Sequence, residues 1–281
     1  MSYVTPKEFA VKMVDAGESK IFMSTKDTLI RAFMAGAILA LAAAFAVTIA
    51  VNTGNFLVAS LLFPVGFCLL YLMGFDLLTG VFTLAPLAVI AKRPGCTWGG
   101  VFRNWGLVFC GNFAGAMTTA ILMAVVFTTG FSAEPNAVGQ KIGHIGEART
   151  LGYAAAGGAG LLTVFVRAIL CNWMVSTGVV AAMMSTSTSG KIMAMWMPIL
   201  VFFYLGFEHS IVNMFLFPSG IMLGGQFTWA DYFIYNEIPV VLGNLVGGLT
   251  FVGGMIYATH FRESPKRNAG RNDDVAGIPA E

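Results

Sequence analysis

Residues 206–215 read Gly-Phe-Glu-His-Ser-Ile-Val-Asn-Met-Phe, a polar interruption inside a long apolar run. Residues 74–76 read Gly-Phe-Asp inside an earlier apolar run, 132 positions before. A second set of matches has the same offset, which indicates an internal repeat. A glycine and a carboxylate in the middle of a hydrophobic segment, present in both copies, predict a transport site near the bilayer midplane. The second set pairs Asn104, Val108, Gly111, Asn112 and Gly115 with Asn236, Val240, Gly243, Asn244 and Gly247.

The composition is typical of a membrane protein. Hydrophobic residues make up 57% of the chain, charged residues only 11%, and the mean hydropathy is +0.77. A length of 281 residues accommodates about six spans of ~20 apolar residues each, with short loops. The net charge of +2 is too small to indicate a nucleic-acid partner. The four cysteines have no spacing typical of a zinc site, so we expect no metal and no disulfide framework.

The apolar runs predict an all-α membrane protein in three parts. We expect a cytoplasmic amphipathic N-terminal segment at 1–28, a six-span domain at 29–260 and a cytoplasmic polar tail at 261–281. A polar segment at 128–149 separates the third span from the fourth. The glycines spaced by four in the third and sixth spans are typical of closely packed membrane helices. The spans are expected at about 29–51, 57–90, 104–127, 160–184, 192–223 and 239–260, with the second broken near 74–80 and the fifth at 206–213.

The two halves therefore hold three spans each. An odd number of spans places the second copy upside down relative to the first, so we expect an inverted 3+3 repeat. If both termini are cytoplasmic, thirteen basic residues fall on the cytoplasmic side and only Lys141 and Arg149 fall outside. This asymmetry predicts that orientation, in the cell membrane, with lipid around the spans.

Candidate chemistry is concentrated in the second break. Glu208, His209 and Asn213 fall within six residues at membrane depth, where a charge costs about 2.5–3.5 kcal/mol on insertion scales. His209 can exchange protons near neutral pH. Asp76 and Glu208 occupy equivalent positions, and we expect both to bond backbone groups freed where each helix breaks.

These motifs carry a family resemblance. The Glu-His-Ser-Ile-Val-Asn-Met sequence at 208–214, with Gly74-Phe75-Asp76-Leu77-Leu78-Thr79 and Cys171-Asn172-Trp173, resembles the formate/nitrite transporter family, closest to its formate channels. The resemblance covers about residues 5–260. It implies an aquaporin-like fold, assembly as a homopentamer with one pore in each protomer, and transport of small monovalent anions such as formate or nitrite.

The resemblance also implies which residues line the pore. His209 would lie at the pore centre, Asn172 would face it, and Asn213, Thr79 and Glu208 would lie alongside. Apolar constrictions would fall at Phe63, Phe67, Leu77 and Phe202.

One position departs from the family. Its members usually have a lysine sixteen residues before the asparagine of span 4, where it draws the anion into the outer vestibule. Counting back from Asn172 leads to Ala156, and no basic residue stands between Thr150 and Arg167. The sequence therefore leaves open what attracts an anion at this side of the pore.

We interpret the chain as a channel or transporter for a small weak-acid anion, with proton transfer at His209 as an optional step. A pore for neutral solutes such as ammonia or water is the alternative. A haem or quinone enzyme subunit would need two intramembrane histidines, and only His209 qualifies, so we expect no enzyme activity and no cofactor.

Overall fold

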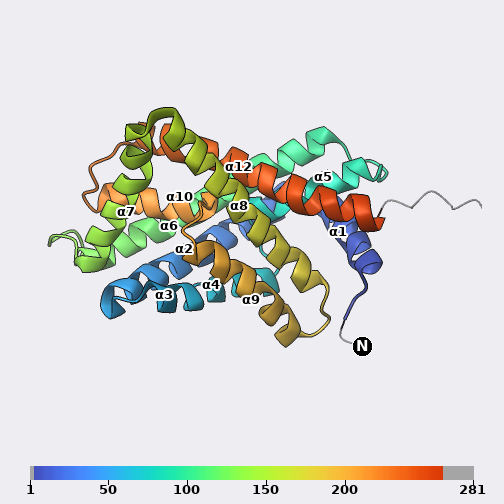
Figure 1. The fold of residues 1–281 in the computed structure, drawn as a ribbon, viewed down its shortest axis with the longest axis horizontal. Helices are drawn as coiled ribbons and strands as arrows, with labels where there is room; N and C mark the ends of the chain where they lie inside the picture. Colours follow the sequence, from blue (N-terminus) through green and yellow to red (C-terminus); the bar gives the residue numbers. More distant parts are fainter. Residues whose placement is uncertain (1–2, 262–281) are drawn as a thin grey trace, which may run out of the picture.

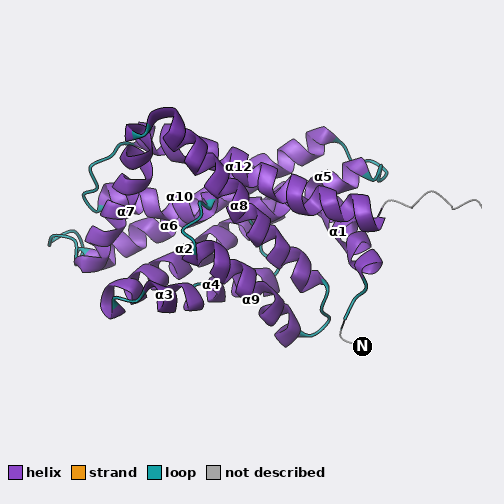
Figure 2. Cartoon of the chain, viewed as in Figure 1, coloured by secondary structure: helices purple, strands orange, loops and turns teal. Residues whose placement is uncertain are grey.

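The computed structural model describes residues 3–261, which are almost entirely helical (Figures 1 and 2). The polar tail predicted at 261–281 lies outside the described residues except for Phe261, which ends the last helical segment. The helices are α1 (Pro6–Phe22), α2 (Thr25–Thr53), α3 (Phe56–Leu62), α4 (Pro64–Leu72), α5 (Leu78–Ile90), α6 (Trp98–Phe127), α7 (Ala137–Ala155), α8 (Gly157–Met183), α9 (Thr188–Tyr204), α10 (Ser210–Met222), α11 (Trp229–Tyr232), α12 (Ile238–Gly248) and the π-helical segments η1 (Phe233–Glu237), η2 (Leu249–Gly254) and η3 (Tyr257–Phe261).

Helices long and apolar enough to cross a bilayer occur four times in the described part: α2, α6, α8 and the continuous helix at Trp229–Phe261. Shorter apolar helices, α3 with α4, α5, α9 and α10, stand between them. Large apolar side chains point outward, with Met193 73%, Val126 64% and Leu162 63% exposed. Such a surface suits contact with lipid or with further protein rather than with water.

Two long helix pairs are in backbone contact through glycines. A Cβ atom on Gly115 of α6 would lie 1.9 Å from the carbonyl oxygen of Phe33 in α2, and one on Gly247 of α12 would lie 2.2 Å from that of Ile169 in α8. No side chain fits at those distances, so these positions require glycine. The close packing expected from the glycine spacing is present in both halves.

The polar segment predicted at 128–149 contains a helix. The side chain of Asn136 accepts hydrogen bonds from the backbone N–H groups of Val138 and Gly139 and caps α7. The buried residues of α7 recur at three- and four-residue steps along one face, and α7 packs against α10, so tertiary contact stabilises a helix that its hydropathy does not predict. The buried residues of this face include Val138, Ile142, Gly146, Thr150 and Tyr153.

The N-terminal segment contains α1, which packs against α5. A Cβ on Gly17 would lie 2.2 Å from the carbonyl oxygen of Leu84, so the two helices touch at their backbones. The buried face of α1 contains Phe9, Met13 and Val14. This contact brings the end of α1 to the first break.

Candidate functional site

The first break lies between α4 and α5. Gly74 has a φ of +73°, which favours glycine and turns the chain out of α4. Asn112 of α6 then binds both sides of the break. Its Oδ1 accepts a hydrogen bond from the N–H of Leu78 at 2.9 Å, and its Nδ2 donates to the carbonyl of Asp76 at 2.9 Å. Nδ2 also donates to Ala32 O in α2 at 2.8 Å.

The second break, between α9 and α10, is held in the same way. Gly206 has a φ of +66°. Asn244 of α12 accepts from the N–H of Ser210 at 3.0 Å and donates to the carbonyl of Glu208 at 2.9 Å. Its Nδ2 also donates to Ala168 O in α8 at 2.8 Å. We call Asn112 and Asn244 the amide clamps, because each satisfies backbone groups that no helix can satisfy.

The clamps reveal that the repeat is not uniform. Asp76 and Glu208 are 132 residues apart, whereas their clamp partners Ala32 and Ala168 are 136 apart. The first half thus has four more residues between its long first helix and its break. In this stretch the first half also has an extra helix boundary at Phe63, where Pro64 begins α4.

The carboxylates do not bond the freed backbone, contrary to the sequence expectation, because the amide clamps already do so. Asp76 instead pairs with Lys20 of α1, at 2.5 Å between Oδ1 and Nζ. Glu208 accepts from the Tyr153 hydroxyl at 2.8 Å and lies 3.4 Å from the Arg149 guanidinium. Each carboxylate therefore binds side chains of a neighbouring helix.

His209 is buried and stands just before α10, whose N-terminus it caps. Its Nδ1 accepts a hydrogen bond from the N–H of Val212 at 3.3 Å, which leaves Nε2 as the protonated nitrogen of the neutral ring. Nε2 lies 3.3 Å from Thr79 Oγ1 across the two halves. The ring of Phe202 stacks on the imidazole, with centroids 5.6 Å apart. The only N–H of this neutral ring thus points towards the first break.

The two asparagines predicted beside His209 hold other groups. Asn172 donates to the carbonyls of Thr79, at 3.2 Å, and Asn244, at 2.6 Å, so it ties the first break to the second. Asn213 donates to Glu208 Oε2 at 2.9 Å and to Asn236 Oδ1 at 2.7 Å. Both side chains are fully buried, and neither lines a cavity described below.

Two cavities approach this centre. The α1-side cavity, of about 250 Å³, begins at α1 and is lined by residues of α4, α5 and α8. The α7-side cavity, of about 90 Å³, reaches His209 and continues into a wider mouth of about 580 Å³. The α1-side cavity includes Lys20, Phe67, Asp76, Leu77, Gly80 and Val179, and the α7-side cavity includes Phe56, Lys141, Ile145, Arg149, Phe202 and His209.

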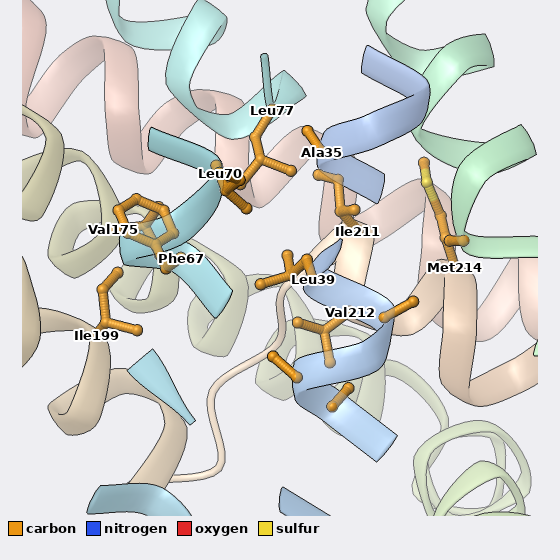
Figure 3. Close-up of a cluster of buried hydrophobic side chains, with 14 of the residues drawn as sticks. Ala35, Leu39, Phe67, Leu70, Leu77, Val175, Ile199, Ile211, Val212 and Met214 are labelled. Atoms are coloured by element: carbon orange, nitrogen blue, oxygen red, sulfur yellow. The ribbon is translucent and has the colours of Figure 1, made fainter. Parts of the chain in front are cut away.

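The predicted constriction residues divide between these cavities. Phe67 and Leu77 line the α1-side cavity, and Phe202 lines the α7-side cavity. Figure 3 shows Phe67 of α4 and Leu77 in one cluster of buried apolar side chains, together with Leu39 of α2 and Ile211 of α10. Phe63 lines neither cavity, because its ring stacks on Phe203 with centroids 3.9 Å apart.

One buried carboxylate near the second break was not among the residues predicted from the sequence. Glu237, in η1, accepts hydrogen bonds from the hydroxyls of Ser210 and Tyr232, the latter at 2.8 Å. It has no counterpart in the first half, where position 105 is Trp105. A carboxylate just before the apolar run of the last span was the signal that could have found it.

These features define a class of protein. The described part of the chain is helical and has an apolar surface suited to lipid. Two cavities enter it from different sides and approach a buried histidine between two interrupted helical segments. This arrangement is that of a membrane transport protein.

Comparison with known proteins gives the family. The sequence profile described as formate/nitrite transporter matches residues 7–258. A probable formate transporter of Methanothermobacter thermautotrophicus is 39% identical over 214 residues, covering 74% of this chain and 76% of that protein. The formate channel FocA of Escherichia coli strain K12 is 29% identical over 281 residues, covering 89% and 93%.

Solved structures share the fold. A structure described as an FNT family ion channel has a TM-score of 0.78 at 25% identity, covering 89% of this chain and 98% of that one. A pentameric formate channel with formate bound has a TM-score of 0.70 at 23% identity, covering 85% and 98%. The chain belongs to the formate/nitrite transporter family, and it is a transport protein of the plasma membrane rather than an enzyme.

Proposed function

We propose that the chain is a channel for small monovalent anions, of which formate and nitrite are the first candidates. The observation that carries the proposal is the α7-side cavity, which leads from a mouth containing Lys141 and Arg149 to the buried His209. Cations at the mouth favour anions, and a hydrogen-bond donor at the end replaces part of the hydration shell that an anion loses. The names of the relatives, probable formate transporter and formate channel, agree with this substrate class.

The architecture proposed with it is a six-span inverted repeat with aquaporin-like topology. The short helices α3, α4 and α5 would together form the second span, and α9 and α10 would together form the fifth span. The two amide clamps support this pairing, since each uses an asparagine of the last span of its half to hold a break. Both termini would then be cytoplasmic, with the α1-side cavity inside and the α7-side cavity outside.

We also propose a homopentamer. Met193, Val126 and Leu162 are more than three-fifths exposed, so the described protomer has apolar surface for both lipid and neighbouring protomers. The fold is shared with a channel described as pentameric. Each protomer has its own two cavities, so one pore per protomer is expected.

The conduction path would run through the break between the two cavities. An anion would leave water at Phe202, accept hydrogen bonds from His209 Nε2–H and the Thr79 hydroxyl, and pass Leu77 and Phe67. If His209 first takes up a proton from water, its imidazolium can pass that proton to the substrate and return to the neutral ring. The neutral acid would then avoid most of the cost of crossing apolar walls. Asn172, Asn213 and Glu208 would position this path without lining it, because none of them lines either cavity and the two amide N–H groups and the carboxylate bind protein.

A neutral solute such as ammonia is the second candidate. The observation that favours it is the apolar setting of His209, whose ring is fully buried against Phe202 and has no acidic partner among the described residues. Such a centre does not require a charge on the solute.

The deciding experiment is stopped-flow uptake into proteoliposomes. Formate, nitrite, hydrosulfide and ammonia are compared at two pH values, with protein-free liposomes as the control. Saturable formate or nitrite flux well above that of the liposomes supports the anion channel. Acceleration of ammonia alone would replace it with the neutral-solute pore.

A further inference from the structure

Helix α7 separates its charged residues onto two faces. Lys141, Ile145 and Arg149 follow one another at four-residue steps and line the mouth of the α7-side cavity. His144 and Glu147 lie on another face, beside the loop that follows α10. Glu147 Oε1 accepts a hydrogen bond from the N–H of Gln226 at 2.7 Å, so this acid is directed away from the mouth. Lys141 and Arg149 therefore line the mouth, whereas Glu147 does not.

The two cations have different surroundings. Arg149 lies against the buried Glu208, at 3.4 Å. Arg167 of α8 also contributes there, because it donates to Tyr153 at 2.9 Å and Tyr153 donates to Glu208. Arg149 is thus paired directly with Glu208, and Arg167 reaches the same carboxylate only through Tyr153.

Lys141 stands two helical turns earlier, about 12 Å along α7 from Arg149. Within residues 3–261 it has no acidic group at ion-pair distance, and its side chain is exposed at the mouth. An unpaired ammonium beside low-dielectric walls raises the local concentration of anions, and the effect falls as salt rises. Ala156, by contrast, lines neither the α7-side cavity nor its mouth.

We propose that Lys141, with the Arg149 cluster behind it, forms a capture site for small monovalent oxyanions at the mouth of the α7-side cavity. The inference rests on the proposed function, and it assigns to α7 the attraction that the sequence left open at Ala156. An anion would first meet Lys141, then the Arg149 guanidinium, and then His209.

The test uses formate uptake into proteoliposomes containing the full chain. Lys141→Gln removes the charge, and its rate at formate well below half-saturation is expected to fall about three- to tenfold at ~10 mM ionic strength. The deficit should shrink to less than about twofold at ~0.3 M. The rate at saturating formate reports the number of working channels and should stay the same. Lys141→Arg should retain the wild-type rates.

A matched control restores the charge on the wrong face. The double variant Lys141→Gln with His144→Lys keeps a lysine on α7 but places it beside Glu147, away from the mouth. We expect it to remain as slow as the single variant. Recovery by this variant would mean that surface charge alone matters, and it would overturn the site.

An unchanged low-salt rate in Lys141→Gln would also overturn the site while leaving the anion channel intact. A wild-type protein that conducts only ammonia would instead overturn the proposed function. Failure of the capture site and failure of the proposed anion channel can therefore be told apart.

Discussion

The two breaks are alike in backbone and different in side chains. Asn112 and Asn244 hold them with the same set of hydrogen bonds. The residue after each carboxylate, however, is Leu77 in the first half and His209 in the second. Both halves therefore contain an asparagine that holds a break in the backbone, but only the second half places a hydrogen-bonding side chain, His209, directly after the carboxylate. Substitution of the clamp asparagines should then have similar effects on stability in the two halves, whereas substitution of His209 and of Leu77 should have different effects on transport.

The amide clamps should give the largest effects. Asn112→Ala and Asn244→Ala each leave an N–H and a carbonyl without a partner at membrane depth, at about 1–3 kcal/mol for each group. We expect a loss of about 3 kcal/mol or more from each, seen as aggregation or a large fall in Tm in detergent. Asn55→Ala, at an exposed helix cap, serves as the control. A severe defect in only one half would break the architectural equivalence.

His209 should affect transport rather than assembly. His209→Ala removes a hydrogen-bond donor at the end of a cavity, and we expect formate flux to fall about tenfold with normal oligomer formation. The pH dependence of flux should also change. The paired variant Leu77→Ala should leave the pH profile as in the wild type. A pH profile untouched by His209→Ala would remove the proton role.

The ion pairs should show a smaller and unequal effect. Lys20→Met leaves Asp76 without its cation, and we expect about 2 kcal/mol of destabilisation, less than for a fully buried pair because Lys20 is partly exposed. Arg149→Met should cost less, since Glu208 keeps hydrogen bonds from Tyr153 and Asn213. Thermal unfolding in detergent measures both, and Lys20→Met with Asp76→Asn should recover part of the loss. An equal cost of the two single variants would contradict this ranking.

The smallest effect is expected at Ala156. It stands between α7 and α8, and it lines neither the α7-side cavity nor its mouth. Ala156→Lys should therefore change the low-salt formate rate by less than about twofold, given screening over the distance to the mouth. Oligomer formation is checked first, because Gly157 follows with a φ of +56°. A larger, salt-sensitive gain would place Ala156 in the outer path.

The sequence predicted much of this molecule because duplicated polar residues stand out in apolar segments. The family was confirmed, as was the all-helical membrane class. The exact six-span inverted repeat, the pore residues and the topology of the termini stay predictions. The role of the clamps was missed although Asn112 and Asn244 were recognised as repeated, because sequence spacing cannot show which side chain reaches a break 34 residues away. Helix α7 was missed because its stability depends on packing against α10.

The clamps also constrain the order in which the protein is made. Every hydrogen-bond partner of the Asn112 side chain, namely Ala32, Asp76 and Leu78, precedes it in the chain. The same is true of Asn244 with Ala168, Glu208 and Ser210. As the chain leaves the ribosome, the first half can lock as soon as α6 has entered the bilayer, before the second half is synthesised. Each break can therefore close with residues of its own half, and the bond between Asn172 and Thr79 is formed only after the second half has begun to be made.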